Sequence, residues 1–143
     1  MVHDLLDQLR SLHTAAIDAR NGYEEARDDA EHSVARPLFQ EMIAVHTKNA
    51  DDLSHVLQRS GAPVGDAGSF MTTVNRTVMN LRALLGGLGG NVVPALIDAE
   101  KHNLSRYDGV LKSADAPADV REILLKNRER LETAIAGMGT LKA

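Results

Sequence analysis

Residues 38–57, LFQEMIAVHTKNADDLSHVL, decide the fold class of this chain. Apolar side chains recur along this stretch at steps of three and four residues, the spacing that gathers them on one face of an α-helix. One step of the apolar face holds His46 where an aliphatic residue would be expected. The face consists of Phe39, Ile43, His46, Ala50, Leu53 and Leu57. A helix of this kind must cover its apolar face, so the stretch predicts packing against further helices.

The same spacing continues on both sides of this stretch. It predicts helices over residues 2–31, 34–60, 69–86, 91–113 and 116–140. No segment alternates strictly between apolar and polar residues, as a half-buried strand would. The prolines fall at the predicted helix starts or in loops, where the missing N–H group does no harm. The sequence therefore predicts an all-α chain.

The lengths of the connections predict how these helices are arranged. Only one or two turn residues remain near 32–33 and near 114–115, so the flanking helices are expected to form antiparallel hairpins. The segment 61–90 is too long for a tight turn and is expected to be a crossover that carries the short helix. Two long hairpins joined by a long crossover are typical of a ferritin-like antiparallel four-helix bundle. Residues 1–143 are expected to form it as a single domain.

Composition excludes several classes of function. The chain has 16 Lys and Arg residues against 20 Asp and Glu residues, a net charge of −4, which predicts no binding to nucleic acid. Cysteine is absent, which excludes disulfides, thiolate metal sites and cysteine nucleophiles. The longest uncharged stretch, residues 83–97, contains glycines and a proline and is shorter than the roughly 20 residues needed to span a bilayer. No membrane segment or secretory signal is expected, and the predicted location is cytoplasmic.

Several short motifs resemble a known family. The stretch Asp18-Ala-Arg-Asn-Gly22-Tyr23-Glu-Glu-Ala26 resembles the signature of an uncharacterised bacterial ferritin-like family, a domain of unknown function. The similarity continues at residues 38–41, at 75–83 and at 99–107. The resemblance implies a ferritin-like bundle and points towards stress physiology. It also implies that metal binding has to be tested residue by residue, because the same superfamily includes di-iron carboxylate proteins.

The sequence lacks the motifs of a complete di-iron centre. Such a centre takes one Glu from each of two helices and a Glu-x-x-His motif from each of the other two. Here Glu41 is followed three residues later by Ala44, and Glu129 is followed by Glu132. A complete centre is therefore not expected, and no cofactor is assigned.

A layer of polar side chains is nevertheless predicted inside the apolar faces. His46, Glu100 and Asn127 each occupy a core step at a similar level of the bundle, with Tyr23 and Tyr107 within two turns of that level. A buried carboxylate needs a hydrogen-bond donor, and His46 is the natural candidate for Glu100. Two interpretations stay open. His46 and Glu100 are candidate ligands of a remnant or single-metal site for iron, manganese or zinc, or they form a hydrogen-bonded pair that fixes the helix register. The second is favoured, because two ligands rarely hold a metal.

The acidic residues of the first helix do not join this layer in the prediction. Asp18 and Glu25 fall beside the apolar face of that helix and are not counted as ligands.

No catalytic residues emerge from the sequence. The glycine-rich residues 86–90 lack the preceding strand and the following Lys-Ser/Thr of a phosphate loop, and no Gly-x-Ser-x-Gly nucleophile motif is present. Met71 and Met79 contribute to an apolar surface on the short helix that could face a second subunit, so a homodimer is expected. The predicted function is that of a non-enzymatic ferritin-like bundle acting through assembly or partner binding. The alternative is a degenerate metal-binding protein that uses the buried Glu/His layer.

Overall fold

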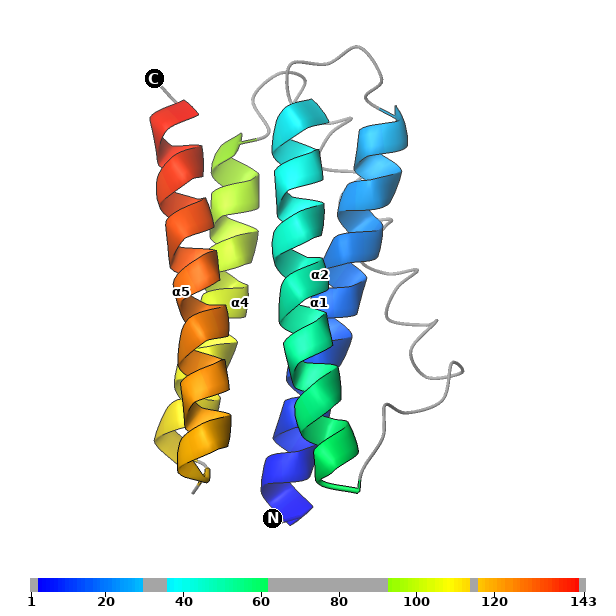
Figure 1. Ribbon diagram of the computed structural model, residues 1–143. Coiled ribbons are helices and arrows are strands. Elements are labelled where there is room, and N and C mark those ends of the chain that lie inside the picture. Colours follow the sequence, from blue (N-terminus) through cyan, green and yellow to red (C-terminus); the bar gives the residue numbers. More distant parts are fainter. Residues whose placement is uncertain (1–2, 30–35, 62–92, 114–115, 142–143) are drawn as a thin grey trace.

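A computed structural model describes most of the chain as helix (Figure 1). The described residues are 3–29, 36–61, 93–113 and 116–141. The helices are α1 (His3–Asp29), α2 (Arg36–Arg59), α4 (Val93–Ser113) and α5 (Ala118–Leu141). These ranges contain no strand, so the all-α prediction is confirmed for the described part of the chain. The predicted short helix 69–86 lies outside the described residues.

The ends of the helices follow local backbone chemistry. Gly61 follows the end of α2 with a φ of 74°, a left-handed conformation that glycine adopts without strain. Its N–H group donates a 3.1 Å hydrogen bond to the carbonyl of Gln58, which closes the last turn. Pro37 and Pro94 each stand second in their helix, where no intrahelical N–H bond is lost. The ends of the four long helices lie within two residues of the predicted positions.

Four described helices lie side by side (Figure 1). Helices α1 and α2 run in opposite directions, and so do α4 and α5. Helix α1 packs against α2 and α4, while α5 packs against α4 and α2. Because each helix has two such neighbours, the inward faces of all four enclose one interior. None of the described helices offers the long apolar stretch that crossing a bilayer requires.

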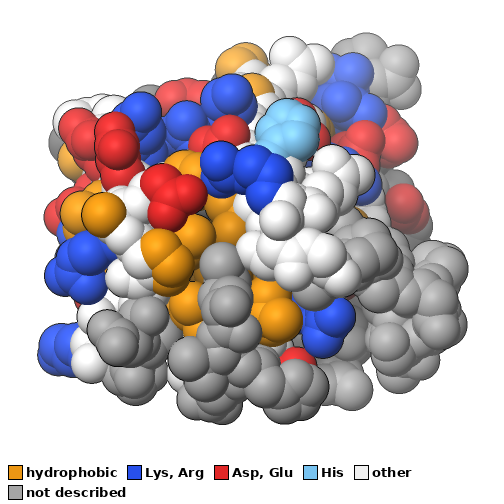
Figure 2. All heavy atoms as spheres, turned by 60° about the horizontal axis from the view of Figure 1, so that its bottom comes forward, with side chains coloured by type: hydrophobic (Ala, Val, Ile, Leu, Met, Phe, Trp, Pro, Cys, Tyr) orange, Lys and Arg blue, Asp and Glu red, His pale blue; other side chains and the backbone are white. Residues whose placement is uncertain are grey.

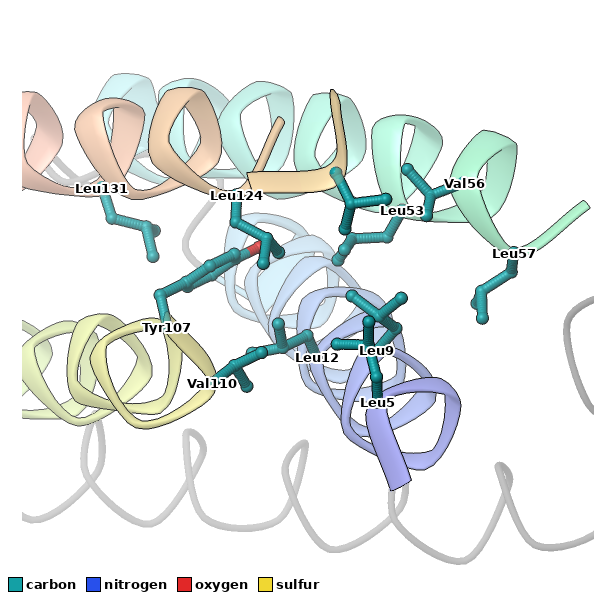
Figure 3. Packing of buried hydrophobic residues seen from close by; sticks show 11 residues of the cluster. Leu5, Leu9, Leu12, Leu53, Val56, Leu57, Tyr107, Val110, Leu124 and Leu131 are labelled. Atoms are coloured by element: carbon teal, nitrogen blue, oxygen red, sulfur yellow. The ribbon is translucent and has the colours of Figure 1, made fainter. Parts of the chain in front are cut away.

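The interior contains two large apolar clusters at different levels of the bundle. The first, shown in Figure 3, consists of Leu5, Leu9, Leu12, Leu53, Val56, Leu57, Tyr107, Val110, Val120, Leu124 and Leu131. The second consists of Ala19, Tyr23, Ala26, Leu38, Phe39, Met42, Leu96, Ile97, Ala134 and Met138. Each large aliphatic side chain buried in this way contributes about 1.5–3 kcal/mol to stability. Along α2 and α4, the buried residues between the two clusters are His46, Asn49, Ala50 and Glu100, and the three polar ones belong to the candidate site.

Candidate functional site

The carboxylate of Glu100 is the centre of the first polar cluster. Its Oε2 atom accepts a 2.7 Å hydrogen bond from the hydroxyl of Tyr23. The Nε2 atom of His46 lies 2.8 Å from Oε2 and 3.1 Å from Oε1. Asn103, one turn further along α4, donates from Nδ2 to Oε1 at 3.0 Å. Both carboxylate oxygens are therefore bonded to protein donors, and the side chain of Glu100 is only 1% exposed.

Aromatic packing fixes the orientation of these groups. The rings of Tyr23 and His46 are stacked, with centroids 5.8 Å apart and planes inclined by 18°. Tyr23 also packs against Phe39, and the centroids of these two rings lie 6.1 Å apart. The phenol and the imidazole are thus held side by side, and both polar ends reach the same carboxylate oxygen.

The surroundings of Glu100 favour its ionised form. Burial by itself would raise the pKa of this carboxyl group. The positive charge of His46 and hydrogen bonds from His46, Tyr23 and Asn103 outweigh burial and lower the pKa below its ordinary value. The pKa of Tyr23 is raised well above its ordinary value, first by burial and then by the charge of Glu100 and their hydrogen bond. Tyr23 therefore remains a neutral donor beside a charged acceptor.

A second polar cluster joins α2 to α5 by a reciprocal pair of hydrogen bonds. The Nδ2 atom of Asn49 donates to the backbone carbonyl of Asn127 at 3.3 Å. In return, Nδ2 of Asn127 donates to the backbone carbonyl of Asn49 at 3.2 Å. The same Asn127 nitrogen lies 3.2 Å from the hydroxyl of Tyr107, which brings α4 into the cluster. Such bonds fix the relative register of the two helices, because sliding either helix would break both.

Arg130 closes this second cluster towards the surface. Its Nη1 atom lies 3.1 Å from Oδ1 of Asn49, 2.7 Å from Oδ2 of Asp52 and 2.7 Å from Oδ1 of Asn127. A guanidinium held by a carboxylate and two amide oxygens keeps both asparagine side chains in the orientation that their backbone contacts need.

A family model matches residues 4–113, which cover nearly all of α1 and the whole of α2 and α4. The chain belongs to the DUF2383 family, a domain of unknown function. No curated protein and no solved structure matches the chain. In this DUF2383 chain the cluster around Glu100 falls inside the matched residues, whereas Asn127 and Arg130 on α5 lie beyond them.

The structure divides the predicted polar layer into two groups. All five predicted side chains, Tyr23, His46, Glu100, Tyr107 and Asn127, are buried. Glu100 is in contact with Tyr23 and His46, whereas Asn127 is in contact with Tyr107.

Four members of these clusters were missed by sequence reasoning. Three of them stand three positions after a predicted residue and therefore on the same helix face: Asn49 after His46, Asn103 after Glu100 and Arg130 after Asn127. The fourth, Asp52, stands three positions after Asn49. That spacing was the signal that could have revealed them.

Helix α1 also carries buried polar groups that the sequence analysis did not place inside. Asp18, predicted to lie beside the apolar face, is 4% exposed, which corrects that expectation. An α-helix turns by about 100° per residue, so the side chain of Asp18 lies between those of Ile17 and Ala19 around the helix. Neighbouring helices that cover Ile17 and Ala19 therefore cover Asp18 as well. His13 is 7% exposed. Its pKa is lowered mainly by burial and also by the charge of Arg20, while Asp51 acts in the opposite direction.

The described part of the chain offers no set of ligands that fits a resident metal ion. Within the described ranges, no group of three or more His, Asp or Glu side chains could hold one. The two candidate ligands, His46 and Glu100, face each other directly, and Glu100 is further bound by Tyr23 and Asn103. Zinc sites take four ligands, of which proteins usually supply three or four. The described chemistry is that of a hydrogen-bonded pair of a carboxylate and an imidazole.

Proposed function

We propose that this DUF2383 chain is a non-enzymatic bundle of the ferritin-like type that works through association, with a second copy of itself as partner. The observation that carries the proposal is the closure of the polar interior: Glu100 and His46 are 1% and 2% exposed, and each carboxylate oxygen is bonded to protein donors. A substrate cannot reach these groups without opening the bundle. The outer surface is therefore the part of the described molecule that is open to partners.

The directions of the helices support the ferritin-like assignment. Helix α2 ends at the opposite end of the bundle from the start of α4 (Figure 1). The end of α2 and the start of α4 are thus separated by the length of the bundle, as in a ferritin-like arrangement and unlike an up-down-up-down bundle. A bacterial origin and a cytoplasmic location stay predictions from the sequence.

The outer face of α5 is the surface that we assign to the contact between two copies. Leu125, at 47% exposed, is the one large hydrophobic side chain that is exposed among the described residues. Beside α5 runs a groove of about 350 Å³ towards α2, lined by Glu41, Val45, Lys126, Glu129, Arg130, Thr133 and Ala134. In a two-fold contact, the same patch of each copy faces the other. A patch with charges of both signs can therefore place positive side chains of one copy opposite negative side chains of the other. Basic and acidic side chains are likewise interspersed around hydrophobic ones on the face shown in Figure 2.

Sedimentation velocity across a concentration series tests this proposal. The wild-type chain is expected to shift from monomer to dimer as its concentration rises, and Leu125→Glu is expected to move that transition to higher concentration by tenfold or more. Ser105→Glu adds the same charge to an exposed position on α4 and serves as the matched control. A wild type that stays monomeric at every concentration, or equal effects of the two variants, would contradict the proposal.

Metal binding through His46 and Glu100 is the alternative function. The contact between an imidazole and a carboxylate favours it, because these are two of the side-chain types that bind iron, manganese and zinc. The absence of a third candidate ligand among the described residues disfavours it. Metal analysis of protein purified without chelator separates the two functions.

A further inference from the structure

The groove between α2 and α5 carries two carboxylates that have no counter-ion among the described residues. Glu41 on α2 and Glu129 on α5 both line the groove, and both side chains are exposed. Neither forms an ion pair or a hydrogen bond with another residue in the described part of the chain. Two neighbouring helices therefore present negative charges to one groove, and a groove lined in this way attracts a cation.

Two cationic side chains line the same groove but do not pair with these carboxylates. The guanidinium of Arg130 is held by Asp52 and by two asparagine oxygens. The Nζ atom of Lys126 lies 3.7 Å from Oε1 of Glu122 on the same helix, and the Lys126 side chain is 61% exposed. An exposed pair of this kind contributes little to stability, so Lys126 can exchange Glu122 for another carboxylate at little cost.

The rest of the lining suits the stem of a lysine. Val45 on α2 and Ala134 on α5 add apolar surface to the groove. A lysine side chain packs its four-carbon stem along apolar surface while its ammonium group stays in a polar environment. Apolar side chains and two carboxylates in one groove therefore match both parts of a lysine.

We propose that Lys126 of a second copy occupies this groove and places its ammonium group against Glu41 and Glu129. The proposal rests on the proposed function, the association of two copies through α5, and names the charges that join them. In a two-fold contact at the groove, each groove faces its own counterpart. Lys126 stands in the groove lining of each copy, so it is positioned to enter the groove of the other. The exchange is reciprocal, and one dimer contains two such contacts.

Charge reversal in separate chains tests this exchange. Lys126→Glu and Glu129→Lys are each expected to weaken self-association by about tenfold or more in sedimentation velocity, because like charges then meet. An equimolar mixture of the two variants is expected to associate about tenfold more tightly than either variant alone. In the mixed dimer, one contact keeps its native charges and the other brings the two reversed charges together. An interaction within one helix cannot produce this rescue, because the two changes lie in different chains.

Two further variants complete the test. Glu41→Lys changes the carboxylate on α2 and is also expected to be rescued by mixing with Lys126→Glu. Lys101→Glu makes the same charge reversal at an exposed position on α4 and is the matched control. It is expected to leave self-association unchanged and to give no rescue when mixed with Glu129→Lys. All four positions are exposed, and circular dichroism checks that each variant is folded.

A mixture of Lys126→Glu and Glu129→Lys that associates no more tightly than its separate components would overturn this proposal. So would single variants that associate like the wild type, a result that leaves the groove to a small cation or to a basic partner of another kind. In either case the proposed function stands if Leu125→Glu still weakens the dimer. A wild-type chain that stays monomeric at every concentration would overturn both proposals.

Discussion

The hydroxyl of Tyr23 on α1 lies 2.7 Å from the carboxylate of Glu100 on α4, although the two residues are 77 positions apart in the chain. The same Oε2 atom also lies 2.8 Å from Nε2 of His46 on α2. One carboxylate oxygen thus ties three helices together in an interior that is otherwise largely apolar. An ion in that position requires its partners, and the consequences can be measured.

Replacing Glu100 by Gln is expected to lower the free energy of unfolding by about 3 kcal/mol, because it removes the buried charged acceptor that His46, Tyr23 and Asn103 share. Urea denaturation followed by circular dichroism measures the change. Glu132→Gln removes the same charge from an exposed ion pair with Arg128 and is expected to cost less than about 1 kcal/mol. Equal losses in the two variants would show that burial of the pair has no energetic consequence.

Replacing Tyr23 by Phe keeps the ring stacked on His46 and removes the hydroxyl that donates to the charged carboxylate. The expected loss is about 1.5–3 kcal/mol, the range for a hydrogen bond to an ionised group. Tyr107→Phe is the matched control, because the Tyr107 hydroxyl bonds to the neutral amide of Asn127 and its removal is expected to cost about 1 kcal/mol. The reverse order of the two losses would contradict the assignment of Glu100 as a charged acceptor.

The stability of the chain is expected to depend on the ionisation of Glu100. Its pKa in the folded chain is lowered, so its carboxylate contributes stability above the pKa of the unfolded chain, about 4.3. That contribution is lost as the pH falls through the folded pKa. The difference in unfolding free energy between wild type and Glu100→Gln should therefore shrink as the pH is lowered from 7 to 3. A difference that stays constant over this range would refute the assignment.

The two tyrosines allow a spectroscopic test at alkaline pH. Tyr23 and Tyr107 are the only tyrosines, the chain has no tryptophan, and the pKa of each is raised mainly by burial. Their neutral forms stabilise the folded chain below the ordinary pKa of about 10, and this contribution is lost as the pH rises through the folded pKa. Tyrosinate absorbance near 295 nm should therefore appear together with the loss of helical circular dichroism. Absorbance that rises near pH 10 while the helices remain intact would contradict the burial of both rings.

Replacing Asn127 by Ala removes the bonds to the Asn49 carbonyl and to Tyr107 and takes one oxygen from Arg130. Since buried partners are left unpaired, the expected loss of unfolding free energy is about 2–4 kcal/mol. Asn21→Ala makes the same change on α1, where Arg20 is the one hydrogen-bond partner of the Asn21 side chain among the described residues, and should have a much smaller effect. Thermal or urea unfolding of both variants measures these losses. An equal loss of unfolding free energy in the Asn21 variant would contradict the prediction.

The sequence allowed the helices of the fold to be predicted because helical periodicity is a local property. The three- and four-residue spacing identified His46 and Glu100 as core positions, because each interrupts an otherwise aliphatic face. The predicted helix 34–60 likewise ends where Gly61 takes the left-handed conformation that follows α2.

The partners across the bundle could not be predicted in the same way. The reciprocal bonds of Asn49 and Asn127 depend on the relative heights of α2 and α5, and no local pattern encodes that height. The burial of Asp18 depends equally on which helices cover α1. Long side chains such as Arg130 reach inward from a half-buried position, so their role depends on the acceptors they meet rather than on the helix face.

Metal analysis tests most directly whether the Glu100–His46 pair is a structural centre. The chain, purified without chelator, is expected to contain iron, manganese and zinc far below one ion per chain. Addition of each metal is expected to leave the melting temperature unchanged, because a ligand that binds the folded state must raise stability by mass action. One metal ion per chain that raises the melting temperature of the wild type but not of Glu100→Gln would contradict this account.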